Sequence, residues 1–306
     1  MTSINIEKIR SELEQYTGNP AGDEPSVSMS AAARGIGVSV TAISQFLSGK
    51  YKGDNQKLAR RVESWLQRVS ERREYNEVFI ETIDTFALRI IWKACRDAHI
   101  QNEMAVITGP SGVGKTRGLR AYAKENPDVV FLRVLPCYSM RDMLSEIHRM
   151  VGFSGHTRVT DMAADIIEKL KGSGRLLIID EAEHLPYKAL EMLRAIYDRA
   201  GVGIVLAGMR HLILNIRGSK GQFKQIYSRI GRHAEVPTME RHPEDIEKLV
   251  SHAIPGSNGI WKAFAEQTDN ARQLEKLVKM SIQIAQKNDS PVTGQIVKQA
   301  KKYIII

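Results

Sequence analysis

The segment GPSGVGKT, residues 109–116, constrains the fold of this chain more strongly than any other feature. It directly follows the apolar run MAVIT, which predicts a buried strand, and it leads into a helical pattern that begins around Gly114. Glycines between a strand and a helix let successive backbone N–H groups point inward, and the helix N-terminus adds partial positive charge. This order of strand, glycine loop and helix predicts a phosphate-binding loop, or P-loop.

The residue types of the P-loop suit a nucleotide bound together with magnesium. Lys115 supplies a positive charge to the terminal phosphates, and the Thr116 hydroxyl is placed to ligate the Mg²⁺ ion that bridges them. We therefore expect ATP and Mg²⁺ as cofactors, with Lys115 also acting in catalysis. The other predicted nucleotide-binding positions of the loop are Gly109, Pro110, Ser111, Gly112, Val113 and Gly114.

A second signal lies in RLLIIDEAEHL, residues 175–185. Its continuous apolar run is typical of a parallel strand that is buried on both faces. Asp180, at the end of that run, can hold the magnesium and so completes the predicted metal site with Thr116. Glu181 is positioned to polarise the water that attacks the terminal phosphate. Two adjacent carboxylates at the end of a strand predict ATP hydrolysis rather than binding alone.

The segments around these motifs predict an α/β fold, a doubly wound parallel sheet. Further strands are expected at residues 129–135 and 202–208, with helices between them and a helix over residues 79–99 before the P-loop strand. Alternating strands and helices favour parallel pairing, which places ligands at the carboxyl ends of the strands. We expect three domains: an all-α helix-turn-helix domain at 1–75, the P-loop core at 76–240 and a helical lid at 241–306.

Residues 28–47, SMSAAARGIGVSVTAISQFL, predict a helix-turn-helix. Ala33 is small enough for two helices to cross there, Gly37 suits the turn, and Ile43 and Phe46 anchor the second helix. The outward positions would contact DNA, with two lysines just beyond the helix to reach the phosphates. The alternative is a helical hairpin that contacts protein. The DNA-contact candidates here are Ser39, Thr41, Ser44, Gln45, Lys50 and Lys52.

Net charge and hydropathy narrow the class of protein further. The formal net charge of +9 favours an acidic partner such as nucleic acid. No apolar stretch approaches the roughly 20 residues that a membrane-spanning helix needs, so no membrane partner is expected. The opening residues MTSINIEKIR lack an apolar signal core. We therefore expect a cytoplasmic protein, in the host-cell cytoplasm if a phage encodes it.

Several motifs together carry a family resemblance. GPSGVGKT, LLIIDEAEHL, QIYSRIGRH and NARQL resemble the motifs of AAA+ ATPases and occur in the same order. With the N-terminal segment GVSVTAISQFLSGKYKGDN, the chain resembles, over nearly its full length, the phage Mu transposition protein B (MuB) family of target-DNA adaptors. The resemblance implies that Arg229 is a catalytic arginine finger, which reaches the nucleotide of a neighbouring subunit. It also implies that Arg272 contacts nucleotide from the lid.

The chain departs from the AAA+ pattern at Met209. Such ATPases usually place Asn or Thr at this strand end to orient the attacking water, and a thioether is a poor substitute. Either another group positions the water, or hydrolysis is slow and depends on DNA or a protein partner. The second alternative fits an ATP-timed switch better than a motor.

Two further regions are candidates for contact with DNA. The segment from Arg199 to Ala234 holds no acidic residue, and its loop NIRGSKGQFK, with Lys220 and Lys224, could follow a phosphate backbone. The resemblance also places DNA near CYSMRD and GHTRVTD, which makes Arg141 and Arg158 candidates. The alternatives are basic residues that serve the ATP site and ordinary solvated arginines at helix ends.

The resemblance implies an ATPase that forms a homo-oligomer, a helical filament or a ring, in the ATP state. This assembly would hold double-stranded DNA without strong sequence preference and present it to a transposase. Two other functions use the same motifs: a helicase loader or replication initiator, and an ATP-gated transcription regulator that binds a defined operator.

Overall fold

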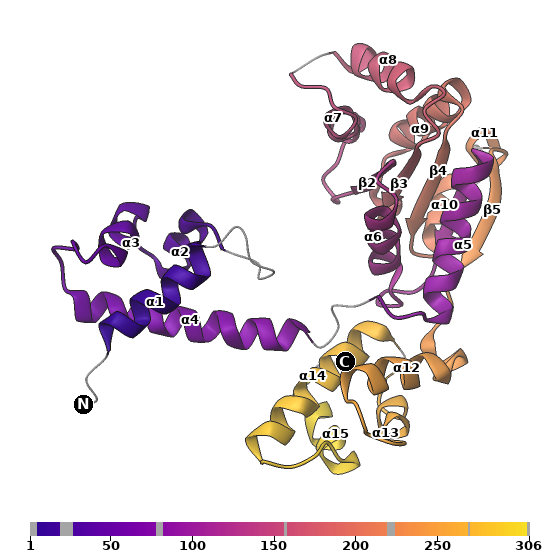
Figure 1. Ribbon diagram of the computed structural model, residues 1–306. Coiled ribbons are helices and arrows are strands. Elements are labelled where there is room, and N and C mark those ends of the chain that lie inside the picture. Colours follow the sequence, from indigo (N-terminus) through magenta and orange to yellow (C-terminus); the bar gives the residue numbers. More distant parts are fainter. Residues whose placement is uncertain are drawn as a thin grey trace. The chain divides into compact units, whose positions relative to one another are not determined.

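The computed structural model describes residues 5–18, 27–77, 82–155, 158–218, 224–268 and 270–304. The chain divides into two compact units, Met1–Ile80 and Glu81–Ile306 (Figure 1). The core and the lid expected from the sequence both belong to the second unit. The division of the chain into three domains at residues 75 and 240 therefore stays a prediction.

The first unit contains four helices among its described residues: α1 (Ile6–Gly18), α2 (Met29–Ile36), α3 (Val40–Leu47) and α4 (Asn55–Glu77). Ala33, Ile43 and Phe46 are buried in one apolar cluster, as the sequence predicts. Gly37 ends α2 in the left-handed conformation, with φ of 78°, and its N–H donates to the Ala33 carbonyl. Ser39 begins α3, because its side chain accepts a hydrogen bond from the N–H of Ala42. The two short helices are thus joined by a glycine-dependent turn.

The second unit is built on a five-stranded sheet in the order β2-β3-β4-β1-β5. All neighbouring strands pair in parallel, which confirms the predicted doubly wound fold. The sequence pattern did not predict β5, because its residues alternate between half-buried and exposed at the edge of the sheet. The strands are β1 (Met104–Thr108), β2 (Val129–Arg133), β3 (Leu176–Asp180), β4 (Gly203–Gly208) and β5 (Ile230–Glu235).

Helices cover both faces of the sheet (Figure 1). One face packs against α5 (Phe86–Gln101) and α6 (Lys115–Glu125). Helix α5 begins at Phe86, later than the sequence pattern suggested, because the Thr85 side chain caps it by accepting from the N–H of Leu88. The other face packs against α7 (Met140–Met150), α8 (Val159–Leu170), α9 (Tyr187–Ala200) and α10 (His211–Arg217).

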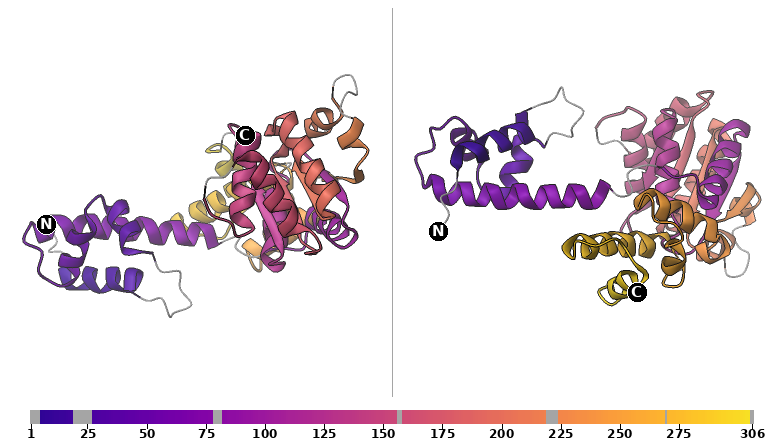
Figure 2. Two further views of the ribbon diagram at one scale, coloured as in Figure 1. Left: turned by 90° about the horizontal axis from the view of Figure 1, so that it is seen from above. Right: turned by 60° about the horizontal axis from the view of Figure 1, so that its bottom comes forward.

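The lid follows β5 and is helical, as expected. The helices of the lid, near the C-terminus, lie next to one another (Figure 2, right, orange to gold). None of the helices in the described residues is long and apolar enough to span a membrane. The lid helices are α12 (Pro243–Ala253), α13 (Trp261–Ala265), α14 (Ala271–Lys287) and α15 (Gly294–Lys301).

Contacts around a buried carboxylate fasten the lid to the start of α5. Asp245 is 2% exposed, and its two oxygens accept from the N–H of Phe86 at 2.8 and 2.9 Å. The Phe86 ring stacks on His242 with 3.7 Å between ring centroids. Lys248 Nζ donates to the carbonyl oxygen of Asp84 at 2.9 Å. Since α5 packs on the sheet, these contacts tie the lid to the strand ends that carry the predicted site.

Replacement of Asp245 by Ala should destabilise the second unit. The substitution leaves a buried N–H without its acceptor, which typically costs about 1–3 kcal/mol of unfolding free energy. Urea unfolding of the full chain measures the loss. Glu247→Ala, an exposed position on the same helix, is the matched control and should change stability by less than about 0.5 kcal/mol. Equal midpoints for the two variants would contradict this role of Asp245.

Candidate nucleotide site

The P-loop joins the end of β1 to the start of α6, and its glycines are required by the backbone. Gly112 and Gly114 have φ of 81° and 100°, in the left-handed region that side chains disfavour. A Cβ at Gly109 would stand 2.7 Å from the carbonyl oxygen of Val236, so this position has no room for a side chain. The loop therefore keeps its backbone uncovered at the N-terminus of α6, where a phosphate binds best.

Lys115 is bound by the P-loop itself. Its Nζ donates to the carbonyl oxygens of Gly109 at 2.7 Å and of Pro110 at 2.8 Å. Burial lowers the pKa of the Lys115 ammonium, while the carboxylates of Glu183 and Asp180 act in the opposite direction. The ammonium thus lies between the loop and the acidic residues that follow β3.

Thr116 and Asp180 meet across the carboxyl edge of the sheet. The Thr116 hydroxyl donates to Asp180 Oδ2 at 2.7 Å, and Asp180 is 1% exposed. Burial raises the pKa of Asp180, and the hydrogen bond from Thr116 lowers it. A hydroxyl beside a buried carboxylate offers the oxygen ligands that Mg²⁺ prefers. These two residues therefore fit the magnesium of a bound nucleotide.

Glu181 is held by an arginine that the sequence argument missed. Arg133, the last residue of β2, donates from Nη2 to Glu181 Oε1 at 2.6 Å. This hydrogen bond and the charge of Glu181 raise the pKa of Arg133. Glu181 itself has a φ of 58°, which is unusual for a residue with a side chain. The only signal for Arg133 in the sequence is a charged residue at the end of an apolar strand.

The lid contacts the P-loop through the first turn of α14. The backbone N–H of Arg272 donates to the carbonyl oxygen of Gly112 at 3.1 Å. The Asn270 side chain lies so close that a Cβ at Gly112 would stand 2.7 Å from its Oδ1. The charge of Arg272 also lowers the pKa of Lys115. Arg272 therefore lies beside the loop, and its contact with a nucleotide stays a prediction.

Comparisons with known proteins agree with this arrangement. A family model described as an AAA domain matches residues 99–214. The Mu-like prophage FluMu DNA transposition protein B of Haemophilus influenzae is 33% identical over 218 residues, which cover 69% of this chain and 75% of that protein. The chain belongs to the transposition protein B family. The ATP-dependent target DNA activator B of Escherichia phage Mu is 29% identical over 237 residues, 76% of this chain and 74% of that protein.

Solved structures support the same fold. The ORC2 protein of Aeropyrum pernix has a TM-score of 0.57 at 18% identity, over 76% of this chain and 71% of that chain. A RuvB mutant of Thermotoga maritima has a TM-score of 0.52 at 16% identity, over 74% and 71% of the two chains. The core of this chain thus has an AAA-type fold.

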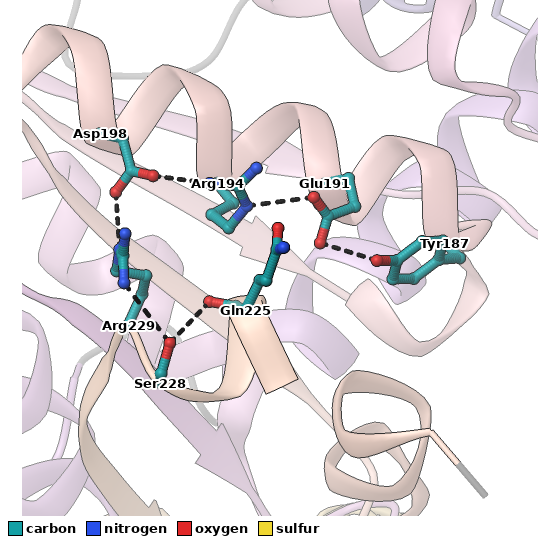
Figure 3. A network of polar contacts seen from close by, with 7 residues as sticks. All are labelled: Tyr187, Glu191, Arg194, Asp198, Gln225, Ser228 and Arg229. Atoms are coloured by element: carbon teal, nitrogen blue, oxygen red, sulfur yellow. Dashed lines mark hydrogen bonds and ion pairs between the residues drawn. The ribbon is translucent and has the colours of Figure 1, made fainter. Parts of the chain in front are cut away.

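Arg229 is exposed and lies between α11 (Lys224–Tyr227) and β5. Its Nε donates to Asp198 on α9 at 2.8 Å, and Arg194 links Asp198 to Glu191 (Figure 3). The hydrogen bond to Asp198 raises the pKa of Arg229, and it lowers that of Asp198. Among the described residues, every hydrogen bond and ion pair of the Arg229 guanidinium is to Asp198 or Ser228. The role of Arg229 as an arginine finger for a neighbouring subunit stays a prediction.

The structure places the DNA-contact candidates in separate regions. Arg141 is exposed in the first turn of α7, and Arg158 is exposed at the start of α8. Lys220 lies outside the described residues, and Lys224 begins α11 with a side chain that the structure does not describe. In the first unit the candidates are all exposed: Ser39, Thr41, Ser44, Gln45, Lys50 and Lys52.

Replacement of Lys115 by Ala should weaken ATP binding about 10-fold or more, because the site loses its charge-assisted hydrogen bonds to phosphate. Titration with a fluorescent ATP analogue measures the affinity. Lys124→Ala, an exposed position near the end of the same helix, should bind like the parent. Equal affinities for the parent and for Lys115→Ala would show that the nucleotide binds elsewhere.

Proposed function

We propose that this chain is an ATP-hydrolysing, Mg²⁺-dependent protein that assembles on double-stranded DNA in its ATP state and presents that DNA to a transposase. The observation that carries the proposal is the Thr116–Asp180 contact beside Glu181, a complete set of groups for a magnesium-bound nucleotide. The names of the relatives, a DNA transposition protein B and two ATP-dependent target DNA activators, support the roles of DNA and of transposition.

Each group of site residues has a separate role in hydrolysis. The P-loop N–H groups and Lys115 bind the phosphates, and Thr116 and Asp180 hold Mg²⁺, which supplies charge neutralisation when bound. Glu181 accepts the proton of the attacking water. In the free protein Arg133 donates to Glu181 Oε1 at 2.6 Å and so holds this carboxylate toward β2. Separation of this pair is a step that DNA can promote, and we expect slow hydrolysis by the isolated protein that rises with DNA.

DNA contact without sequence preference fits the exposed basic residues. Lys50 and Lys52 follow α3 in the first unit, and Arg141 and Arg158 begin helices of the second unit. Lys220 and Lys224 are further candidates in the run without acidic residues. Such contacts neutralise phosphates and make the affinity strongly dependent on salt. The cytoplasm, of the host cell if a phage encodes the chain, is the compartment where DNA and ATP are both available.

Imaging of the full chain with DNA tests the proposal. With a non-hydrolysable ATP analogue we expect continuous filaments or stacked rings along the DNA, and with ADP or without nucleotide we expect none. Lys115→Ala should form none under any condition, while Lys124→Ala should match the parent. Binding to DNA by a monomer without ATP would overturn the proposal.

Arg229 should complete the nucleotide site of the adjacent subunit. Arg229→Ala should keep its affinity for nucleotide but lose about 100-fold or more of the DNA-stimulated turnover. A mixture of Arg229→Ala and Glu181→Gln, each inactive alone, should regain part of the turnover, because a Glu181→Gln subunit still binds ATP, assembles and supplies Arg229 to its neighbour. Full activity of Arg229→Ala, or a mixture that stays inactive, would contradict the assignment.

The two alternative functions predict different results in experiments on the full chain. Co-purification with a hexameric helicase rather than a transposase would favour a helicase loader. A footprint at one defined operator, in place of uniform coverage, would favour an ATP-gated transcription regulator. The names of the sequence relatives favour the transposition role over both.

A further inference from the structure

Glu183 follows Glu181 in a short turn that points back toward the sheet. The turn Ala182–His184 is a 3₁₀ helix directly after β3. It closes because the N–H of His184 donates to the Glu181 carbonyl at 3.1 Å. The side chain of Asn215 holds the turn from the other side, since its Nδ2 donates to the carbonyl oxygen of Glu183 at 3.1 Å. The backbone of Glu183 is thus fixed by contacts with two elements.

The Glu183 carboxylate lies at the end of β4. Its Oε1 accepts from the backbone N–H of Met209 at 3.2 Å. Its Oε2 is buried, and within the described part of the chain it has no hydrogen-bond partner. A buried carboxylate oxygen without a donor is costly, so native proteins supply one, often an ordered water or a ligand. One oxygen of Glu183 therefore has a hydrogen-bond donor, and the other is buried without one.

The last residue of β4 makes room for this carboxylate. A Cβ at Gly208 would overlap Glu183 Oε2, so only glycine lets the side chain occupy this place. The neighbouring Met209 side chain is 39% exposed and offers no polar group in its stead. The polar group at the end of β4 thus comes from the turn after β3.

Glu183 also faces the nucleotide pocket. Of the three carboxylates that raise the pKa of Lys115, Glu183 has the largest effect, ahead of Asp180 and Glu181. In the sheet, β4 lies between β3, which ends at Asp180, and β1, which leads into the P-loop. The end of β4, where the Glu183 carboxylate accepts from Met209, therefore lies between Asp180 and the P-loop.

We propose that the free carboxylate oxygen of Glu183 accepts a hydrogen bond from the attacking water and aligns it, in place of the polar side chain that Met209 lacks. This inference rests on the proposed ATP hydrolysis. The water gives its other proton to Glu181, its oxygen forms a bond to the terminal phosphorus, and the bond from that phosphorus to the bridging oxygen breaks. The products are ADP and phosphate, and the proton on Glu181 passes to solvent.

Four variants of the full chain test the role of Glu183. Glu183→Ala should lower kcat for DNA-stimulated hydrolysis about 100-fold, the cost of a misplaced nucleophile. Its affinities for a non-hydrolysable fluorescent ATP analogue and for ADP should stay within about 2-fold of the parent. Glu183→Gln keeps an acceptor oxygen and should retain more activity than Glu183→Ala. His184→Ala, an exposed neighbour in the same turn, is the control and should match the parent, whereas Glu181→Gln should be inactive.

Gly208→Ala tests the position of the carboxylate without removing it. Because the new Cβ displaces Oε2, this variant should lose kcat as Glu183→Ala does. The double variant should be no worse than either single one, since both remove the same contact.

The outcomes separate this inference from the proposed function. Parent-like kcat in Glu183→Ala, with Glu181→Gln inactive, overturns the role of Glu183 alone. Loss of nucleotide affinity in step with kcat, or additive losses in the double variant, assigns Glu183 a structural role and also overturns it. Equal turnover by the parent and Glu181→Gln overturns hydrolysis at this site and the inference with it.

Discussion

The hydrogen bond from Thr116 to Asp180 joins the two halves of the site, and it depends on the order of the strands. Thr116 lies in the first turn of the helix after β1, and Asp180 ends β3. These strands are not adjacent, since β4 lies between them. Parallel pairing brings the carboxyl ends of all three to one edge, so groups that are far apart in the chain meet there. The rest of the site, from the P-loop to Glu181 and Glu183, is arranged around this contact.

The charged groups of the site are occupied by partners within the chain. Lys115 binds two loop carbonyls, Arg133 binds Glu181, and Arg229 binds Asp198. The Lys115 contacts are part-buried, whereas the two arginine pairs lie at the surface, where an ion pair typically contributes at most about 1 kcal/mol to stability. Under the proposed function, these groups exchange partners before they act. A site of this kind suits a protein whose nucleotide sets how long it stays on DNA.

Much of the fold could be predicted because β1, β3 and β4 are buried on both faces and therefore form unbroken apolar runs, and the edge strand β2 is also almost wholly apolar. β1, β2, β3 and β4 lie where those runs predict them, whereas β5 has the alternating burial of an edge strand and was missed. Thr85 starts α5 later than the apolar pattern suggested, because capping by a single side chain sets the first turn. Arg133 and Glu183 escaped notice, although Glu183 lies within LLIIDEAEHL, because their contacts are made with strands that are adjacent in space and not in sequence.

By itself, the sequence determined the local machinery: a P-loop with left-handed glycines, the lysine and threonine that follow them, and two acidic residues after an apolar strand. Each of these depends on neighbours within a few residues, so spacing along the chain is sufficient to specify it. Only the tertiary structure decided which groups meet across the strands. Arg133 reaches Glu181, and Glu183 reaches the end of β4, where Gly208 leaves room and Met209 supplies an N–H. Those contacts depend on strand order and register, which no local pattern encodes.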